Sequence, residues 1–380
     1  MIYLDHAAAT PMDPHVAAAQ QPFFTDQFYN PSANYMAAQK VRRALDAARS
    51  DVALQLGVRA NEIIFTAGGT ESDNLAIQGV MRQFPDANVV VSAVEHDAVL
   101  EPATMFDHSV AGVTKQGLID LADLESKIDK RTVLVSVMYA NNEVGTVQPL
   151  RHVARLIERI RTARRMAGNT LPIYLHTDAC QAANYLDLHV SRLGVDLMTL
   201  NGGKIYGPKQ SGILFVSSKV VLTPIIRGGG QERNLRSGTE NVAACVGFAK
   251  ALDIAQAGRR DEIARLEYLQ ALAYKLIAEK LPHVVINGSL SHRLPNNVHL
   301  TLPGQDNERL LVELDERGIL AAAGSACSAS SEEPSHVLRA MGISDADAQA
   351  SLRITMGRRT AESDIETLVQ TLSELTTKPL

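Results

Sequence analysis

Short apolar runs alternate with longer helical patterns along the first 216 residues of the chain. Runs such as Val89–Val91 and Val133–Val135 are apolar at consecutive positions, which is typical of strands inside a sheet covered on both faces. The predicted strands are Glu62–Thr66, Asn88–Ala93, Thr132–Tyr139, Pro172–Thr177, Val195–Leu200 and Gly212–Val216. The predicted helices between them are Ser32–Leu56, Thr70–Gln83, Leu121–Ile128 and Leu150–Met166. This alternation predicts an α/β layered fold with a mostly parallel central sheet.

The pattern changes after Val216. A Gly-rich stretch, Arg227–Gln231, leads into a long helical region from about residue 240 to residue 280. Shorter strands and helices then alternate; they are predicted at Val284–Asn287, Asn296–Leu302, Asp306–Arg317, Pro334–Met341, Ser351–Met356 and Ala361–Leu375. We therefore expect a large α/β domain over residues 15–255 and a smaller α+β domain formed by residues 1–14 and 256–380.

Length and composition narrow the class of protein. The 380 residues exceed the size of about 250–300 at which one core stops growing, and 46% hydrophobic residues are typical of a globular chain. A formal net charge of −5 argues against a dedicated nucleic-acid binder. The sequence has no apolar run that would span a bilayer and no signal-peptide pattern at its start, and three cysteines do not make a disulfide framework. A reducing cytoplasm is the expected location.

Several polar groups follow predicted strands directly. Gly68–Thr70 come after a strand and open a helix, so their N–H groups could bind an anion such as phosphate, or could simply form a turn capped by Thr70. His96 follows the next strand and could stack on a planar ring, shuttle protons or make a structural hydrogen bond. Asn141–Glu143 could hold a ring oxygen or build a turn.

Asp178 and Lys204 follow the next two strands. Ligands of α/β sheets gather at the carboxyl ends of the strands, where Asp178 could pair with a cationic cofactor or cap a helix. Lys204 lies among glycines just past a strand, a setting in which an amine with a lowered pKa forms Schiff bases; the alternative is a surface lysine. Lys209 is a rival amine, but Pro208 beside it indicates a turn.

The run Ala321–Ser331 consists almost wholly of small residues around Cys327. Such a run cannot anchor itself by apolar burial, so we expect it to be mobile and its thiol to be a nucleophile that visits two places. The alternative is a flexible loop with an incidental cysteine. Cys180 and Cys245 are expected to be small apolar fillers.

Two further patterns give no indication of a catalytic role. Arg151, Arg155 and Arg159 are spaced by four along one predicted helix, which indicates a solvated face, with a docking surface as the alternative. No Cys/His grouping has zinc spacing, so we expect no resident metal.

Taken together and in order, the motifs resemble the pyridoxal-phosphate (PLP)-dependent cysteine desulfurases of the NifS/IscS kind, in the class V aminotransferase group. The resemblance rests on Tyr3–Pro11, Gly69–Asn74, Glu95–His96, Asn141–Gly145, Asp178–Gln181, Lys204–Lys209, Gly229–Thr239, Gly324–Cys327 and Glu333–Ala340. It implies a PLP-dependent aminotransferase-like large domain and a small domain that carries a mobile cysteine loop at about residues 321–333. The small residues around Cys327 resemble the subgroup with the long loop.

The resemblance also implies how the cofactor would be held. Lys204 would bind PLP as a Schiff base, Asp178 would keep the pyridine nitrogen protonated, and His96 would stack on the ring and take part in proton transfer. The remaining contacts would be made by Gly69 and Thr70 to the phosphate, by Asn142 and Gln181 to the ring hydroxyl, and by Thr239 to the phosphate of a neighbouring subunit in a homodimer.

One segment departs from the family pattern. The family usually shows Ser-x-His-Lys where this chain has Asn201-Gly202-Gly203-Lys204. Asn201 can still donate a hydrogen bond to the phosphate through its amide, but Gly203 offers no imidazole. Each lost charge-assisted contact would weaken cofactor retention by about 1.5–3 kcal/mol.

The activity implied is conversion of L-cysteine to L-alanine. Arg353, with Asn142, would bind the substrate carboxylate, and Cys327 would take the sulfur as a persulfide and pass it to an acceptor protein. Iron–sulfur scaffolds and tRNA-thiolation carriers are the acceptors expected for the family, and Cys327 could share a transient cluster with a scaffold. The alternatives are a selenocysteine lyase or related class V enzyme, and a catalytically weak sulfur-relay scaffold.

Overall fold

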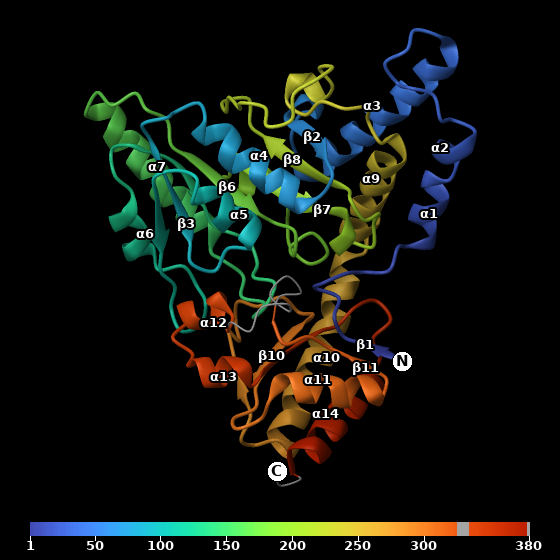
Figure 1. The fold of residues 1–380 in the computed structure, drawn as a ribbon, viewed down its shortest axis with the longest axis vertical. Helices are drawn as coiled ribbons and strands as arrows, with labels where there is room; N and C mark the ends of the chain where they lie inside the picture. The colour runs from blue at the N-terminus through green and yellow to red at the C-terminus, as the bar shows by residue number, and fades with distance from the viewer. Residues whose placement is uncertain (325–333, 378–380) are drawn as a thin grey trace.

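A seven-stranded sheet forms the centre of the molecule in the computed structural model, which describes residues 1–324 and 334–377 (Figure 1). In spatial order its strands are β2 (Ile63–Thr66), β8 (Gly212–Val216), β7 (Leu197–Asn201), β6 (Tyr174–Asp178), β5 (Thr132–Ser136), β3 (Asn88–Ser92) and β4 (His108–Ala111). β8 runs antiparallel to both of its neighbours, and the other pairs are parallel. Six strands therefore end at the same edge of the sheet, as predicted for a mostly parallel α/β fold.

Helices cover both faces of this sheet. One face packs against α3 (Met36–Leu56), α6 (Leu121–Lys127), α7 (Leu150–Met166) and α9 (Val242–Ala257), and α1 (Pro14–Gln20) packs on α9. The other face packs against α4 (Gly69–Met81) and α5 (Asp97–Ala103). Successive strand residues alternate between the two cores, so that Phe65 lies in the first and Ile64 in the second. Burial on both faces explains why the strands are apolar at consecutive positions.

A second lobe lies below the first in Figure 1. Its three-stranded antiparallel sheet has β10 (Asn297–Thr301) between β9 (Val285–Ile286) and β12 (Ser351–Thr355). Its core is completed by α10 (Arg259–Lys280), α11 (Asn307–Glu316) and α14 (Glu362–Thr377). Near the amino terminus, β1 (Ile2–Tyr3) pairs in parallel with β11 (Ile319–Leu320), and Asp5 forms a bridge with Thr355. The start of the chain thus lies against the lobe formed by its end; the exact division into two domains stays a prediction.

The elements differ from the sequence-based expectations where local signals compete. The helical region from 240 to 280 is two helices, because α9 ends and α10 begins at Gly258, which carries no side chain to support a continuous helix. β4 and α5 were not expected: β4 is only four residues long, and α5 contains Pro102. The other short elements are α2 (Pro22–Thr25), α8 (Val190–Leu193), α12 (His336–Ala340) and α13 (Asp345–Gln349).

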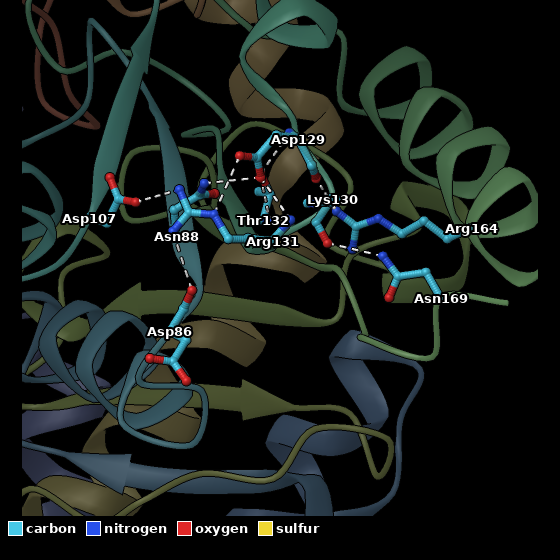
Figure 2. Close-up of polar contacts among 9 residues, drawn as sticks. All are labelled: Asp86, Asn88, Asp107, Asp129, Lys130, Arg131, Thr132, Arg164 and Asn169. Atoms are coloured by element: carbon cyan, nitrogen blue, oxygen red, sulfur yellow. Dashed lines mark hydrogen bonds and ion pairs between the residues drawn. The ribbon is translucent and has the colours of Figure 1, made fainter. Parts of the chain in front are cut away.

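Polar contacts tie together the amino ends of the central strands (Figure 2). The Asp129 carboxylate accepts hydrogen bonds from Asn88 Nδ2 at 3.0 Å, from the Arg131 N–H at 2.8 Å and from the Thr132 N–H at 3.1 Å. Arg131 pairs with Asp107 at 2.8 Å. Partial burial alone would raise the pKa of Asp129, but these donors hold it below its ordinary value. Arg164 and Asn169 of the α7 side add bonds to the carbonyls of Asp129 and Lys130.

Within residues 1–324 and 334–377, no helix is long and apolar enough to cross a membrane.

Candidate active site

Three turns meet at the carboxyl edge of the large sheet. Asp178 is the last residue of β6, and Lys204 lies in a 3₁₀ turn, Gly202–Lys204, directly after β7. Gly69 opens α4 after β2, and a Cβ placed there would lie 2.9 Å from Cys180 Sγ and 3.4 Å from Asn201 Nδ2. The turns after β2, β6 and β7 are therefore in close approach. A side chain at position 69 would fill the space between them.

The turn before α4 presents backbone donors. Gly68 has φ of +130°, a conformation that residues with side chains rarely adopt, and this kink turns the chain from β2 into the helix. The first N–H groups of a 13-residue helix have no acceptor within the helix, and its dipole favours a negative charge there. Thr70, in this first turn, is exposed. The Glu71 carboxylate pairs with Arg236 at 2.8 Å and also accepts the Ala67 N–H at 3.1 Å, which braces the segment that leads into the helix.

The amine of Lys204 lies against the start of the chain. Its Nζ donates to the carbonyl oxygens of Ala7 at 2.8 Å and Ala8 at 2.6 Å, and Gln181 Nε2 also donates to the Ala7 carbonyl at 3.0 Å. Lys204 and Gln181 are thus brought together at the Ala7 carbonyl, and the sequence pattern did not show that the start of the chain packs here. The rival amine of Lys209 donates instead to the Thr10 carbonyl at 2.5 Å, and burial lowers its pKa.

The departure at Asn201 and Gly203 has a local explanation. Asn201 Oδ1 accepts the Gly203 N–H at 2.9 Å, and the Gly203 carbonyl accepts the hydroxyl of Thr10 at 3.0 Å. A Cβ at Gly203 would lie 3.3 Å from both Asn201 Oδ1 and the Lys209 side chain, so a larger residue has little room. The two residues therefore brace the Lys204 turn, and Asn201 Nδ2 faces the Gly69 turn.

A buried network lies beneath Asp178. His176 is fully buried; its Nδ1 bonds the Ser136 hydroxyl at 2.9 Å, and its Nε2 lies 3.5 Å from Asp73 Oδ1. Burial lowers the pKa of His176 to about 4, so the imidazole is neutral at pH 7. Burial, and next the Asp178 charge, raise the pKa of Asp73 well above its ordinary value. Burial thus favours the neutral form of the Asp73 carboxyl, beneath the strand end that carries Asp178.

Glu95 joins two of the strand ends. It is fully buried, its carboxylate accepts the Met138 N–H at 2.5 Å, and Asn141 Nδ2 donates to the neighbouring Val94 carbonyl at 3.0 Å. Burial raises the pKa of Glu95 to about 8, with a further increase from Asp178. These bonds fix the turn of His96 beside the turn of Asn142.

His96 and Asn142 differ in how they are held. His96 caps α5, because its Nδ1 accepts the Ala98 N–H at 3.0 Å, which fixes the orientation of the ring. Asn142 contributes its carbonyl to Arg353 Nη1 at 3.3 Å. Arg353 itself is only 1% exposed and pairs with Asp5 at 2.7 Å. Asp5, Asp73, Glu95 and His176 were not among the site residues predicted from the sequence. The one signal for the first three was that they fall inside the motifs Tyr3–Pro11, Gly69–Asn74 and Glu95–His96.

One expected residue, Thr239, lies apart from this cluster. Thr239 is exposed and lines a cavity of about 250 Å³ that also includes Thr66, Ala67 and Arg236. Cys327 lies outside the described residues. Burial raises the pKa of Cys245, which makes that thiol unreactive. The described residues contain no group of three or more His, Cys, Asp or Glu side chains arranged to hold a metal ion.

The chemistry of these donors fits pyridoxal phosphate. The group needs an amine for its aldehyde carbon, a carboxylate for its ring nitrogen and N–H donors for its phosphate. Lys204, Asp178 and the first turn of α4 supply these groups at one edge, and the absence of a side chain at Gly68 and Gly69 leaves the backbone open to a phosphate.

Comparisons with known proteins agree with this chemistry. Residues 2–368 match the family model described as Aminotransferase class-V. The chain is 37% identical to "Cysteine desulfurase IscS" of Dictyoglomus turgidum, over 99% of this chain and 95% of that relative, and 38% identical to "Cysteine desulfurase IscS 1" of Archaeoglobus fulgidus, over 98% and 96%.

Solved structures give the same picture. A NifS-like protein from Rickettsia africae is 31% identical, with a TM-score of 0.88 over 99% of both chains. SspA in complex with cysteine is 32% identical, with a TM-score of 0.78 over 94% of this chain and 99% of that one. The chain therefore belongs to the aminotransferase class-V family of PLP-dependent enzymes. Within that family its relatives are cysteine desulfurases, the group that its motifs resemble.

Proposed function

We propose that this chain is a PLP-dependent cysteine desulfurase that converts L-cysteine to L-alanine and takes the sulfur as a persulfide on Cys327. The observation that carries the proposal is the convergence of Lys204, Asp178 and the start of α4 at one sheet edge. Relatives named cysteine desulfurase, 37–38% identical over nearly the whole chain, support the substrate and the reaction.

The residues of the site divide the work. PLP, when bound, supplies an electron sink for the substrate's α-carbon. Asp178 holds a proton on the ring nitrogen, the His176 imidazole beneath it is neutral at pH 7, and burial disfavours a charge on Asp73. Lys204 Nζ, freed from the carbonyls of Ala7 and Ala8, is placed to move protons at the substrate.

Four further residues orient the reactants. His96 stacks on the ring in the orientation that its bond to Ala98 fixes. Gln181 and Asn142 position the ring hydroxyl. Arg353, held beside Asn142, binds the substrate carboxylate.

The sulfur leaves on a protein thiol. The thiolate of Cys327 attacks the substrate sulfur, the carbon–sulfur bond breaks, and the former substrate carbon takes a proton to give alanine. A free thiol has a pKa of about 8.5, so Cys327 needs a base to ionise it at neutral pH. The persulfide then passes to an acceptor protein, an iron–sulfur scaffold or a tRNA-thiolation carrier.

The remaining proposals concern assembly and location. Thr239 reaches the phosphate of a neighbouring subunit, so the working unit is a homodimer. Support comes from the exposure of Thr239 beside Ala67, in the segment that leads into the α4 turn. The protein works in the cytoplasm, where its thiols stay reduced.

The test compares two cysteine variants of the holoenzyme. Cys327→Ala is expected to keep the visible absorbance of bound cofactor and to lose persulfide formation, whereas the control Cys245→Ala, a buried thiol of α9, is expected to keep both. Normal persulfide yield in Cys327→Ala would refute the assignment. Comparing the rates of alanine release from L-cysteine and from L-selenocysteine separates the desulfurase from a selenocysteine lyase. A purified protein that is colourless, and stays colourless with added PLP, indicates the catalytically weak sulfur-relay scaffold.

A further inference from the structure

Arg353 is a buried cation whose charge is balanced by an unexpected partner. Its side chain is 1% exposed, and a buried guanidinium is stable only when anions and acceptors surround it. Nη2 bonds Asp5 Oδ1 at 2.7 Å, and Nη1 bonds the Asn142 carbonyl at 3.3 Å. Nε has no hydrogen-bond partner among the described residues. The N–H at Nε of this guanidinium is therefore left for another acceptor.

Asp5 belongs to a turn that is built to stay in place. We call residues Asp5–Ala9 the N-terminal turn. The Tyr3 hydroxyl lies 2.9 Å from the Asp5 carbonyl and 2.8 Å from the Ala9 carbonyl, and so closes the turn. The Ala7 N–H donates to the Thr355 hydroxyl at 2.9 Å. The turn is thereby fixed to β12, the same strand that carries Arg353.

The same turn touches the other cation of the site. The carbonyls of Ala7 and Ala8 accept the Lys204 amine, two and three residues after Asp5. One short, braced segment therefore contacts both the amine and the guanidinium. No other described carboxylate forms an ion pair with Arg353.

We propose that Asp5 is a positioning residue, which holds the Arg353 guanidinium at a set place relative to the Lys204 amine so that it receives the substrate carboxylate. The proposal rests on the proposed function, in which Arg353 is the carboxylate anchor. Asp5 contacts a single guanidinium nitrogen, so the substrate carboxylate can bind beside it through the donor at Nε.

A competing role for Asp5 predicts the opposite result. If the Asp5 carboxylate instead occupied the place of the substrate carboxylate, its removal would tighten substrate binding. The direction of the change in KM therefore separates positioning from competition.

The experiment measures steady-state alanine release from L-cysteine by the holoenzyme with Asp5→Asn. The amide keeps the size and one acceptor but removes the charge, and we expect KM to rise about tenfold with kcat changed less than about twofold. Inhibition by 3-mercaptopropionate, which has the carboxylate without the amine, should weaken by a similar factor. Inhibition by cysteamine, which has the amine without the carboxylate, should stay unchanged.

Two comparison variants make the result specific. Asp196→Asn removes a carboxylate that pairs with Arg161 and accepts the Leu175 N–H, away from the site, and should leave both inhibition constants unchanged. Tyr3→Phe loosens the N-terminal turn without removing charge; it is expected to raise KM less than Asp5→Asn, and it provides the test if Asp5→Asn does not fold.

The outcomes separate the two proposals. The positioning role is overturned if a folded Asp5→Asn protein has an unchanged or lowered KM, or if both inhibitors weaken equally. In either case, alanine release by the wild-type enzyme still supports the desulfurase. If Asp5→Asn does not fold, an unchanged KM in Tyr3→Phe overturns the role. A wild-type holoenzyme that releases no alanine overturns both proposals. If Arg353→Lys leaves KM unchanged, Arg353 is not the anchor of the substrate carboxylate, and the positioning role of Asp5 is overturned with it.

Discussion

The two edges of the large sheet handle acidic side chains in opposite ways. At the amino edge, Asp129 lies exposed among N–H donors and its pKa is held below the ordinary value (Figure 2). At the carboxyl edge, Asp73 and Glu95 are buried with few donors, and their pKa values are raised. The same strands thus carry a carboxylate stabilised as an anion by hydrogen-bond donors at one end, and carboxyl groups whose ionised form is disfavoured by burial at the other. The contrast indicates that the amino edge serves stability and the carboxyl edge serves chemistry.

The largest effect is expected from Asp178→Asn. The amide cannot hold a proton on the cofactor ring nitrogen, so alanine release should fall at least about a hundredfold. The matched change at the other edge, Asp129→Asn, should leave the rate within about twofold. Equal losses of alanine release in Asp178→Asn and Asp129→Asn would show that the two edges do not differ in function.

A change in pH dependence is expected from Glu95→Gln. Glu95 has an ordinary pKa of 4.5 and a pKa of about 8 in the folded protein, so the folded state keeps a proton that the unfolded chain has lost. Stability therefore falls as pH rises from about 5 to 8, by up to about 4 kcal/mol from this group. Glu95→Gln should lose less stability than wild type over that range in thermal unfolding. An identical pH profile would show that Glu95 is ionised in the folded protein.

A smaller loss of stability is expected from Asp129→Asn itself. The amide replaces a carboxylate that accepts four hydrogen bonds, so the free energy of unfolding should fall by about 1 kcal/mol, since the site is exposed. The pH dependence of stability from Asp129 has the opposite sign to that from Glu95. Because the pKa of Asp129 is lowered in the folded protein, its contribution to stability is lost as pH falls below about 4. Denaturant unfolding at pH 7 and pH 3 measures both effects.

The smallest effect is expected from Arg131→Met. Its pairing with Asp107 is about half exposed on both sides, so its loss should cost less than about 1 kcal/mol and should vanish at high salt. A larger loss, or one that persists at 1 M salt, would mean that the amino edge depends on this ion pair.

The sequence predicts the sheet well because its strands are buried on both faces. Residues 212–216 are a strand exactly where their apolar run predicts it, and the family resemblance is confirmed over residues 2–368. The pairing of β1 with β11 could not be predicted, because two-residue strands carry no periodicity. The roles assigned to Lys204, Asp178 and Thr239 stay predictions.

Parts of the site escaped prediction for a different reason. Asp73 and Glu95 look like ordinary polar positions until the fold buries them. Arg353 stands in the apolar strand Ser351–Thr355, where its charge signals a partner but does not name Asp5. Contacts between residues 348 positions apart depend on tertiary packing.

The placement of β8 has a consequence for the order of biosynthesis. Among the described residues, β2 borders the sheet and β8 is its only partner strand, so residues 63–66 stay unpaired until residues 212–216 have been translated. An emerging chain that stops short of β8 can pair its parallel strands and pack α4 on β5, β6 and β7, but the strand that leads into Gly68–Thr70 still lacks its partner. Vitamin B6 capture is therefore expected to follow, rather than assist, the folding of the first lobe.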